Sequence, residues 1–300
     1  RSGTTLLQQM LDAHPDIAIA PETHFMRLFW GSREHYGDLT EDKNYQQLIE
    51  DIIALPEFSE MELDSQVFST FAWQVERSYA AIFQLLLKEF ASHHNVTVVG
   101  EKTPNHVLYM PEIQGLFPDA RFVHIVRDPR SVVNSWRSVP WSTGSVVEDA
   151  EMWRYYVSAT QRKPPKGPGK VFTLHYEKLV IAPEESLRSL CQFIDLAFDP
   201  VMLNYYEKNS TLVNIEREPW KKNAVKPVTQ ASLSKWQRTL SVADIAAIEG
   251  KTWFEMQRYG YQPQTSLFQL LPGLAKTTLE RRLKRFVNSV KYKAQKVTQS

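Results

Sequence analysis

The sequence predicts an α/β protein with a mostly parallel central sheet and helices on both of its faces. Two observations support this fold class. Short apolar runs typical of buried strands alternate with segments of helical periodicity, and the chain opens with a glycine-containing turn that runs straight into a helix. With 300 residues, 43% of them hydrophobic and 23% charged, the chain can build one large core or two small ones.

The elements follow in order along the chain. Leucine and methionine at helical spacing predict a first helix over residues 4–11, which His14 and Pro15 end. Apolar runs predict strands at 17–20, 96–99, 121–126 and 171–174. Helical spacing predicts further helices at 41–55, 70–92, 113–117, 131–137, 146–161, 183–194, 200–208, 242–258 and 275–294. Residues 163–169 hold too much proline and glycine for either pattern and predict a loop.

Charge divides the chain into a domain over residues 1–262 and a helical C-terminal extension over 263–300. The extension holds 8 basic residues and 1 acidic residue, which leaves 27 basic and 33 acidic residues in the domain. This mildly acidic domain does not fit a general nucleic-acid binder. The extension combines a basic face with an apolar stripe, so it is expected either to contact an anionic membrane or a partner, or to pack on its own domain.

Two residue types exclude other classes. The single cysteine, Cys191, rules out an intrachain disulfide and lies in an apolar run, so we expect it in the core. The 8 histidines show no metal-binding spacing, and no metal site is expected.

The sequence has no apolar run of membrane-spanning length and no signal-peptide pattern, and is compatible with a cytoplasmic location.

The first five residues, Arg1, Ser2, Gly3, Thr4 and Thr5, form the most informative motif. A turn before a helix exposes backbone N–H groups, and the hydroxyls and the guanidinium add donors, so the motif predicts an anion site. Simple capping of the helix is the alternative. The motif lacks the lysine of the usual nucleoside-triphosphate loop.

This loop resembles that of the sulfotransferases that use 3′-phosphoadenosine 5′-phosphosulfate (PAPS), which has the form P-x-R-S-G-T-T after the first strand. Because the chain starts inside this motif, the resemblance implies a P-loop-like fold whose first strand is missing from this sequence. A second match places Arg127 at the end of a predicted strand and Ser135 in the following helix. In the family these two positions bind the 3′-phosphate, whereas pairing with Asp128 is the structural alternative for Arg127.

The resemblance is closest to the tyrosylprotein sulfotransferase branch and covers most of residues 1–262. Matching segments are Met10 to Pro15, Glu22-Thr23, Lys102 with Pro104, His175 to Glu177, Lys226 to Val228 and Leu233 to Trp236. By this match, Tyr176, Lys226 and Lys235 are further nucleotide contacts.

Transfer chemistry requires an in-line acceptor, a base and stabilised charge. The resemblance assigns Glu22 as the general base, Lys102 as the cation near the leaving oxygen, and Arg1 with the loop threonines as ligands of the sulfuryl oxygens. The structural alternatives are a loop carboxylate or helix cap for Glu22, and a salt bridge to Glu101 for Lys102.

Four positions depart from the branch. Trp220 stands where the branch has a serine that is thought to stabilise the transition state. His24 and Leu28 stand where it has two arginines that bind acidic peptides, with Arg27 close by. Val139 replaces a second arginine of the 3′-phosphate region, for which Arg137 is a possible substitute. These departures weaken the case for an acidic-peptide acceptor and leave donor binding untouched.

The sequence therefore predicts a sulfotransferase with PAPS as cosubstrate and a hydroxyl-bearing acceptor. Protein tyrosine, carbohydrate and small-molecule hydroxyls all remain open as acceptors. A nucleotide kinase and a non-catalytic nucleotide-binding module are the rival classes.

Overall fold

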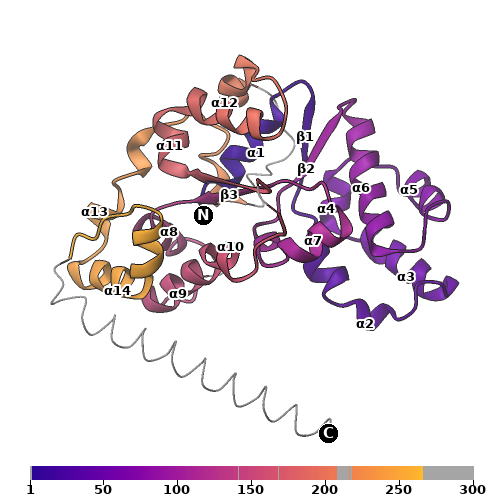
Figure 1. The fold of residues 1–300 in the computed structure, drawn as a ribbon, viewed down its shortest axis with the longest axis horizontal. Helices are drawn as coiled ribbons and strands as arrows, with labels where there is room; N and C mark the ends of the chain where they lie inside the picture. The colour runs from indigo at the N-terminus through magenta and orange to yellow at the C-terminus, as the bar shows by residue number, and fades with distance from the viewer. Residues whose placement is uncertain (1, 141, 168, 208–215, 217, 266–300) are drawn as a thin grey trace, which may run out of the picture. The chain divides into compact units, whose positions relative to one another are not determined.

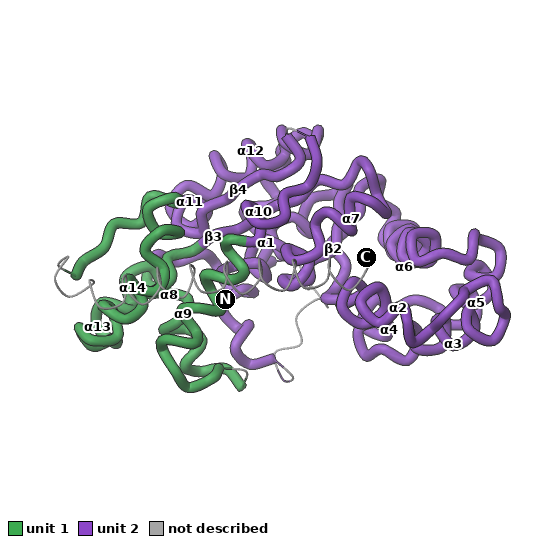
Figure 2. Tube along the Cα trace, turned by 60° about the horizontal axis from the view of Figure 1, so that its bottom comes forward, with its two compact units in different colours: residues 1, 127–158, 231–300 green, residues 2–126, 159–230 purple. Residues whose placement is uncertain are grey.

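The computed structural model describes residues 2–140, 142–167, 169–207, 216 and 218–265. The chain forms two compact units, coloured purple and green in Figure 2. The larger unit contains residues 2–126 and 159–230, and the smaller unit contains residues 127–158 and the described residues from 231 onward. The predicted helix at 275–294 lies outside the described residues, and the predicted boundary at 262 stays a prediction.

The larger unit contains the strands β1 (Ile17–Ala20), β2 (Val98–Glu101), β3 (Phe122–Val126) and β4 (Val171–His175). Strand β1 pairs in parallel with β2, and β3 pairs in parallel with β4. The parallel direction confirms the sequence prediction, although the ladders join these strands as two pairs. Every residue of β1 is buried, as expected for a parallel strand covered on both faces.

Helices surround these strands (Figure 1). Those of the larger unit are α1 (Thr4–Asp12), the π-helix η1 (Met26–Trp30), α2 (Arg33–Tyr36), α3 (Asp42–Ile53), α4 (Pro56–Glu60), α5 (Ser65–Ala72), α6 (Tyr79–His93), η2 (Pro104–Leu108), α7 (Met110–Leu116), α10 (Ala159–Arg162), α11 (Tyr176–Ile181), α12 (Pro183–Phe193), η3 (Pro200–Glu207) and η4 (Pro219–Lys221). Helices α1 and α6 pack on β1, α6 also packs on β2, and α11 and α12 pack on β4. Cys191 of α12 is fully buried, which confirms its place in the core.

Two long predicted helices are each divided in the structure. The segment 70–92 contains the end of α5 and all of α6 but its last residue, because the Ser78 hydroxyl accepts the Ala81 N–H and caps a new helix there. The apolar spacing runs through this break, so periodicity alone does not reveal it. The segment 146–161 likewise divides after Val157 into two helices.

The smaller unit is helical and contains α8 (Pro129–Trp136), α9 (Val146–Val157), α13 (Trp236–Thr239) and α14 (Val242–Arg258). The short helix η5 (Gln230–Ser232) lies where the chain enters this unit. Helix α14 packs on α8 and α9, and α13 packs on α8. Ser241 and Asp244 form a capping box that starts α14. Within the described ranges, no helix is both long enough and apolar enough to span a bilayer.

A buried ion network holds the smaller unit together. The Arg130 guanidinium donates to both oxygens of Asp128 and, at 2.6 Å, to Oε1 of Glu249. It also lies over the Trp236 ring, 4.1 Å from the ring centroid. Glu249 has no exposed surface and accepts the backbone N–H groups of Gln264 and Thr265 at 2.9 and 3.0 Å. The network therefore joins α8, α13 and α14 to the segment that follows α14.

Candidate active site

The predicted anion loop lies at the start of α1. Gly3 is the N-cap residue, with φ 95° and ψ 13°, and no side chain caps this helix. The Tyr176 ring lies directly against Gly3, so a β-carbon on residue 3 would overlap Tyr176 Cδ2. Ser2, Thr4 and Thr5 are partly buried, and Arg1 lies outside the described residues. The structure thus brings two predicted nucleotide-site elements together, the loop and Tyr176, which begins α11 directly after β4.

Tyr205 binds the backbone of Lys226, a further predicted nucleotide contact. Its hydroxyl donates to the backbone carbonyl of Lys226, whose side chain is exposed. Burial, followed by the nearby hydroxyl of Tyr176, raises the pKa of Tyr205, so this hydroxyl remains a donor at neutral pH. Tyr205 belongs to η3, which packs on α1. Tyr205 is not predicted from the sequence, since nothing in its local pattern separates it from a core aromatic residue.

Glu22 and Lys102 meet because the strands before them are parallel. Ala20, at the end of β1, is opposite Glu101, at the end of β2, so the residues that follow both strands emerge at the same edge. The Lys102 ammonium donates to Oε1 of Glu22, with 11% and 23% of the two side chains exposed. The structure therefore places the two predicted catalytic groups in contact, and Lys102 does not use Glu101 as its partner.

Glu101 instead links the segment that follows β1 to the segment that follows β2. Its carboxylate accepts the Thr23 backbone N–H at 3.0 Å and the Thr103 backbone N–H at 2.9 Å. It also pairs with His106 Nδ1 at 2.7 Å. Burial raises the pKa of Glu101, but His106 and the threonine hydrogen bonds outweigh burial and lower it overall. Glu101 is therefore ionised and fixes the loops that carry Glu22 and Lys102.

A second lysine contacts the candidate base. Lys221, the last residue of η4, places its Nζ 3.4 Å from Glu22 Oε1 and 2.5 Å from Glu218 Oε2. Burial acts to raise the pKa of Glu22, but the positive charges of Lys102 and Lys221 outweigh it and lower that pKa. The pKa of Lys102 is lowered, mainly by burial and also by Lys221, against the opposing effect of Glu22. Glu22 is thus ionised at neutral pH and able to accept a proton.

The backbone just after Glu22 is unusual. His24 has φ 52°, a left-handed conformation that is rare for residues other than glycine. Its carbonyl accepts the N–H groups of Arg27 and Leu28, and the π-helix η1 follows. Strained residues and π-helical turns are frequent at functional sites. His24 and Leu28, the positions where the resemblance locates acceptor-binding arginines, therefore lie in backbone of unusual conformation: a left-handed residue and a π-helix.

The smaller unit holds the predicted 3′-phosphate residues. Arg127 is buried and its Nη2 donates to the Ser232 carbonyl at 3.0 Å, while Asp128 pairs with Arg130. Ser135 lies in the last turn of α8, and the exposed Lys235 is the N-cap of α13.

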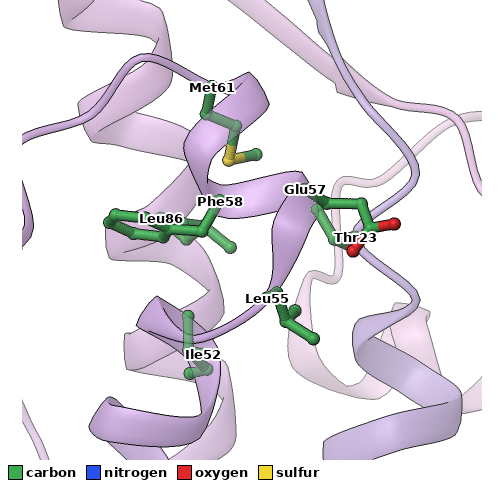
Figure 3. A pocket seen from close by; sticks show the side chains of 7 residues that line it. All are labelled: Thr23, Ile52, Leu55, Glu57, Phe58, Met61 and Leu86. Carbon is green, nitrogen blue, oxygen red and sulfur yellow. The ribbon is translucent and has the colours of Figure 1, made fainter. Parts of the chain in front are cut away.

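One small pocket borders the loop that carries the base. Figure 3 shows its mostly apolar lining, formed by Thr23, Ile52, Leu55, Glu57, Phe58, Met61 and Leu86. A lining of this kind, with a carboxylate, does not suit an anionic nucleotide. In the described part of the chain, no group of three or more His, Cys, Asp or Glu side chains could hold a metal ion, and the expected absence of a metal stays a prediction.

Solved structures identify the fold. The sulfotransferase domain from the curacin biosynthetic pathway matches with a TM-score of 0.60 and 18% identity, covering 87% of this chain and 94% of that one. The sulfotransferase domain from the Synechococcus PCC 7002 olefin synthase matches with a TM-score of 0.57 and 22% identity, covering 83% and 90%. The chain thus has the P-loop-like sulfotransferase fold, as the sequence predicted.

The family follows from the sequence comparison. A model described as the sulfotransferase family matches residues 1–200, and the chain belongs to that family. A putative protein-tyrosine sulfotransferase of Caenorhabditis briggsae is 24% identical over 79% of this chain and 77% of its own length. Protein-tyrosine sulfotransferase 1 of Danio rerio is 25% identical over 89% and 71%, and the Drosophila melanogaster protein-tyrosine sulfotransferase is 27% identical over 79% and 45%. The protein is a sulfotransferase, and its resemblance to the tyrosylprotein branch is confirmed.

Proposed function

We propose that this protein transfers a sulfuryl group from PAPS to the phenolic hydroxyl of a protein tyrosine, with Glu22 as the general base. The observation that carries the proposal is the contact of Glu22 with Lys102 and Lys221, at the common edge of two parallel strands. The names of the similar proteins support tyrosine as the acceptor. Family membership favours sulfuryl transfer over the kinase alternative.

In the proposed reaction, the acceptor oxygen forms a bond to sulfur while the bond from sulfur to the bridging phosphate oxygen breaks. The phenolic proton passes to Glu22, whose lowered pKa keeps it ionised before the reaction. The leaving nucleotide, 3′-phosphoadenosine 5′-phosphate (PAP), takes the electron pair of the broken bond. Lys102 offsets the negative charge that develops there.

Donor binding is assigned by the resemblance. We propose that Arg1, Ser2, Gly3, Thr4 and Thr5 bind the phosphosulfate part. Further proposed nucleotide contacts are Tyr176, Lys226 and Lys235, with Arg127 and Ser135 as ligands of the 3′-phosphate. Contact of the C-terminal extension with a membrane and a cytoplasmic location stay predictions.

The donor assignment is tested by calorimetric titration with PAP and with ATP. PAP is expected to bind with a micromolar Kd and ATP much more weakly, because Arg127 provides a planar fork for the 3′-phosphate. Arg127→Ala should lose this preference, whereas Arg258→Ala, which removes an exposed arginine at the end of α14, should keep it. Equal binding of PAP and ATP would contradict the donor assignment.

The acceptor and the base are tested with radiolabelled PAPS. Peptides that differ only in tyrosine, phenylalanine or serine at one position compare the possible hydroxyls directly, and we expect label on the tyrosine peptide alone. Glu22→Gln should lower kcat by about 10²- to 10⁴-fold without changing PAP affinity, because an amide cannot take the proton. PAP binding without transfer to tyrosine would reject the acceptor and retain the donor.

A further inference from the structure

Lys221 lies at the candidate base although the chain approaches it from a distant segment. It is 199 positions from Glu22 in sequence, and only 12% of its side chain is exposed. The neighbouring Lys222 is exposed. Lys221 is also next to Trp220, the position where the resemblance calls for a serine that this chain lacks. A cation therefore stands beside the base close to the altered position.

Both lysines contact the same oxygen of Glu22. Lys102 and Lys221 each place an ammonium at Oε1, and no described residue donates a hydrogen bond to Oε2. Since 23% of the Glu22 side chain is exposed, the carboxylate is not closed off from solvent. A carboxylate held through one oxygen keeps the lone pairs of its other oxygen for an incoming proton.

Lys102 and Lys221 have different roles available to them during sulfuryl transfer. Lys102 has to offset charge on the leaving nucleotide, so it cannot serve Glu22 alone throughout the reaction. The Lys221 ammonium also pairs with Glu218 Oε2, at 2.5 Å. Two further described groups influence this centre: His24 lowers the pKa of Glu22, and Glu101 raises that of Lys102.

We propose that Lys221 is a positioning residue for the general base, and this proposal rests on the function proposed above. Together with Lys102 it fixes Oε1 of Glu22, so that Oε2 takes the acceptor proton. When Lys102 engages the donor, Lys221 keeps Glu22 ionised and in place. Lys102 thus stabilises the leaving nucleotide while Lys221 holds the general base, so that no single cation has to do both.

The experiment compares Lys221→Gln with Lys222→Gln, a matched change at the exposed neighbouring lysine. Lys221→Gln is expected to lower kcat roughly tenfold, the scale of one lost charge-assisted contact, with little change in KM for PAPS. Because Lys221 lowers the pKa of Glu22, its removal should move the acid limb of the kcat profile to higher pH. Lys221→Arg should restore the position of that limb, and Lys222→Gln should match the unmodified protein.

A measurement without turnover separates this proposal from the proposed function. Carbon-13 NMR of the glutamate carboxyl groups, with Glu22→Gln to assign the signal, gives the pKa of Glu22 directly. A higher pKa in Lys221→Gln than in Lys222→Gln supports the role of Lys221 even if no sulfuryl transfer is detected. Identical pKa values and identical pH profiles in the two variants would overturn it, while transfer activity would still stand for the proposed function.

Discussion

Two carboxylates of this protein, Glu249 and Glu22, face cations in very different settings. Glu249 has no exposed surface, and both of its oxygens accept hydrogen bonds, from Arg130 and from the segment after α14. Glu22 is partly exposed and receives both of its lysines on one oxygen. A carboxylate with every lone pair used can only stabilise structure, whereas one with an open oxygen can also accept a proton.

Glu249→Gln should have the largest effect on stability. It removes one anion from Arg130 and points an amide group at the N–H donors of Gln264 and Thr265. The free energy of unfolding should fall by about 3 kcal/mol or more, as for a broken buried ion pair. Urea unfolding followed by tryptophan fluorescence measures this. Glu148→Gln, at an exposed position of α9, is the control, and equal midpoints in the two variants would refute the prediction.

Glu101→Gln should have an intermediate effect, because Glu101 is buried but lies beside the candidate site. We expect a loss of about 2 kcal/mol at pH 7, from its hydrogen bonds and its pairing with His106. The folded pKa of Glu101 is below its ordinary value of 4.5, so the unfolded chain takes up this proton at higher pH than the folded protein. Its stabilisation is complete above pH 4.5 and is lost as pH falls through the folded pKa.

The pH dependence separates this effect from simple loss of packing. Below pH 4.5, the stability of Glu101→Gln should fall less steeply with acid than that of the unmodified protein. Urea midpoints measured in half-unit steps of pH provide the two slopes. Parallel slopes would show that another group controls the acid response.

Glu22→Gln should have the smallest effect on stability. Both lysines bind one oxygen of its carboxylate and none of the described residues donates to the other, so we expect the free energy of unfolding to fall by about 1 kcal/mol, less than for the other two variants. The same urea measurement at pH 7 checks this. A loss as large as that of Glu249→Gln would show that Glu22 contributes to stability as much as Glu249 does.

The site residues that could be predicted from the sequence are those that lie in recognisable local motifs. The turn before α1, the ends of β1 and β2, and the resemblance around them indicated Gly3, Glu22 and Lys102. The contact of Glu22 with Lys102 follows from parallel pairing of β1 and β2, which a strand and helix pattern implies. Lys221 was not predicted, because its contact with Glu22 depends on the path of a segment without periodicity, 199 positions away.

In the fold, too, features with a local periodic pattern were predicted, and features that depend on single or distant contacts were not. Strands and single amphipathic helices were predicted close to their observed bounds, because burial on one face leaves a periodic pattern. The break before α6 was not predicted, since it depends on one hydroxyl of Ser78 within an unbroken apolar pattern. The role of Arg130 also escaped prediction, because Glu249 is 119 positions away.

The packing of Tyr176 on Gly3 limits how this loop can change during evolution. Any side chain at residue 3 meets two separate obstacles, a left-handed φ of 95° and the occupied space at the Tyr176 ring. A smaller residue at 176 would remove the second obstacle and leave the first. No single compensating substitution therefore opens position 3, because a change at residue 176 leaves the left-handed φ of residue 3 in place.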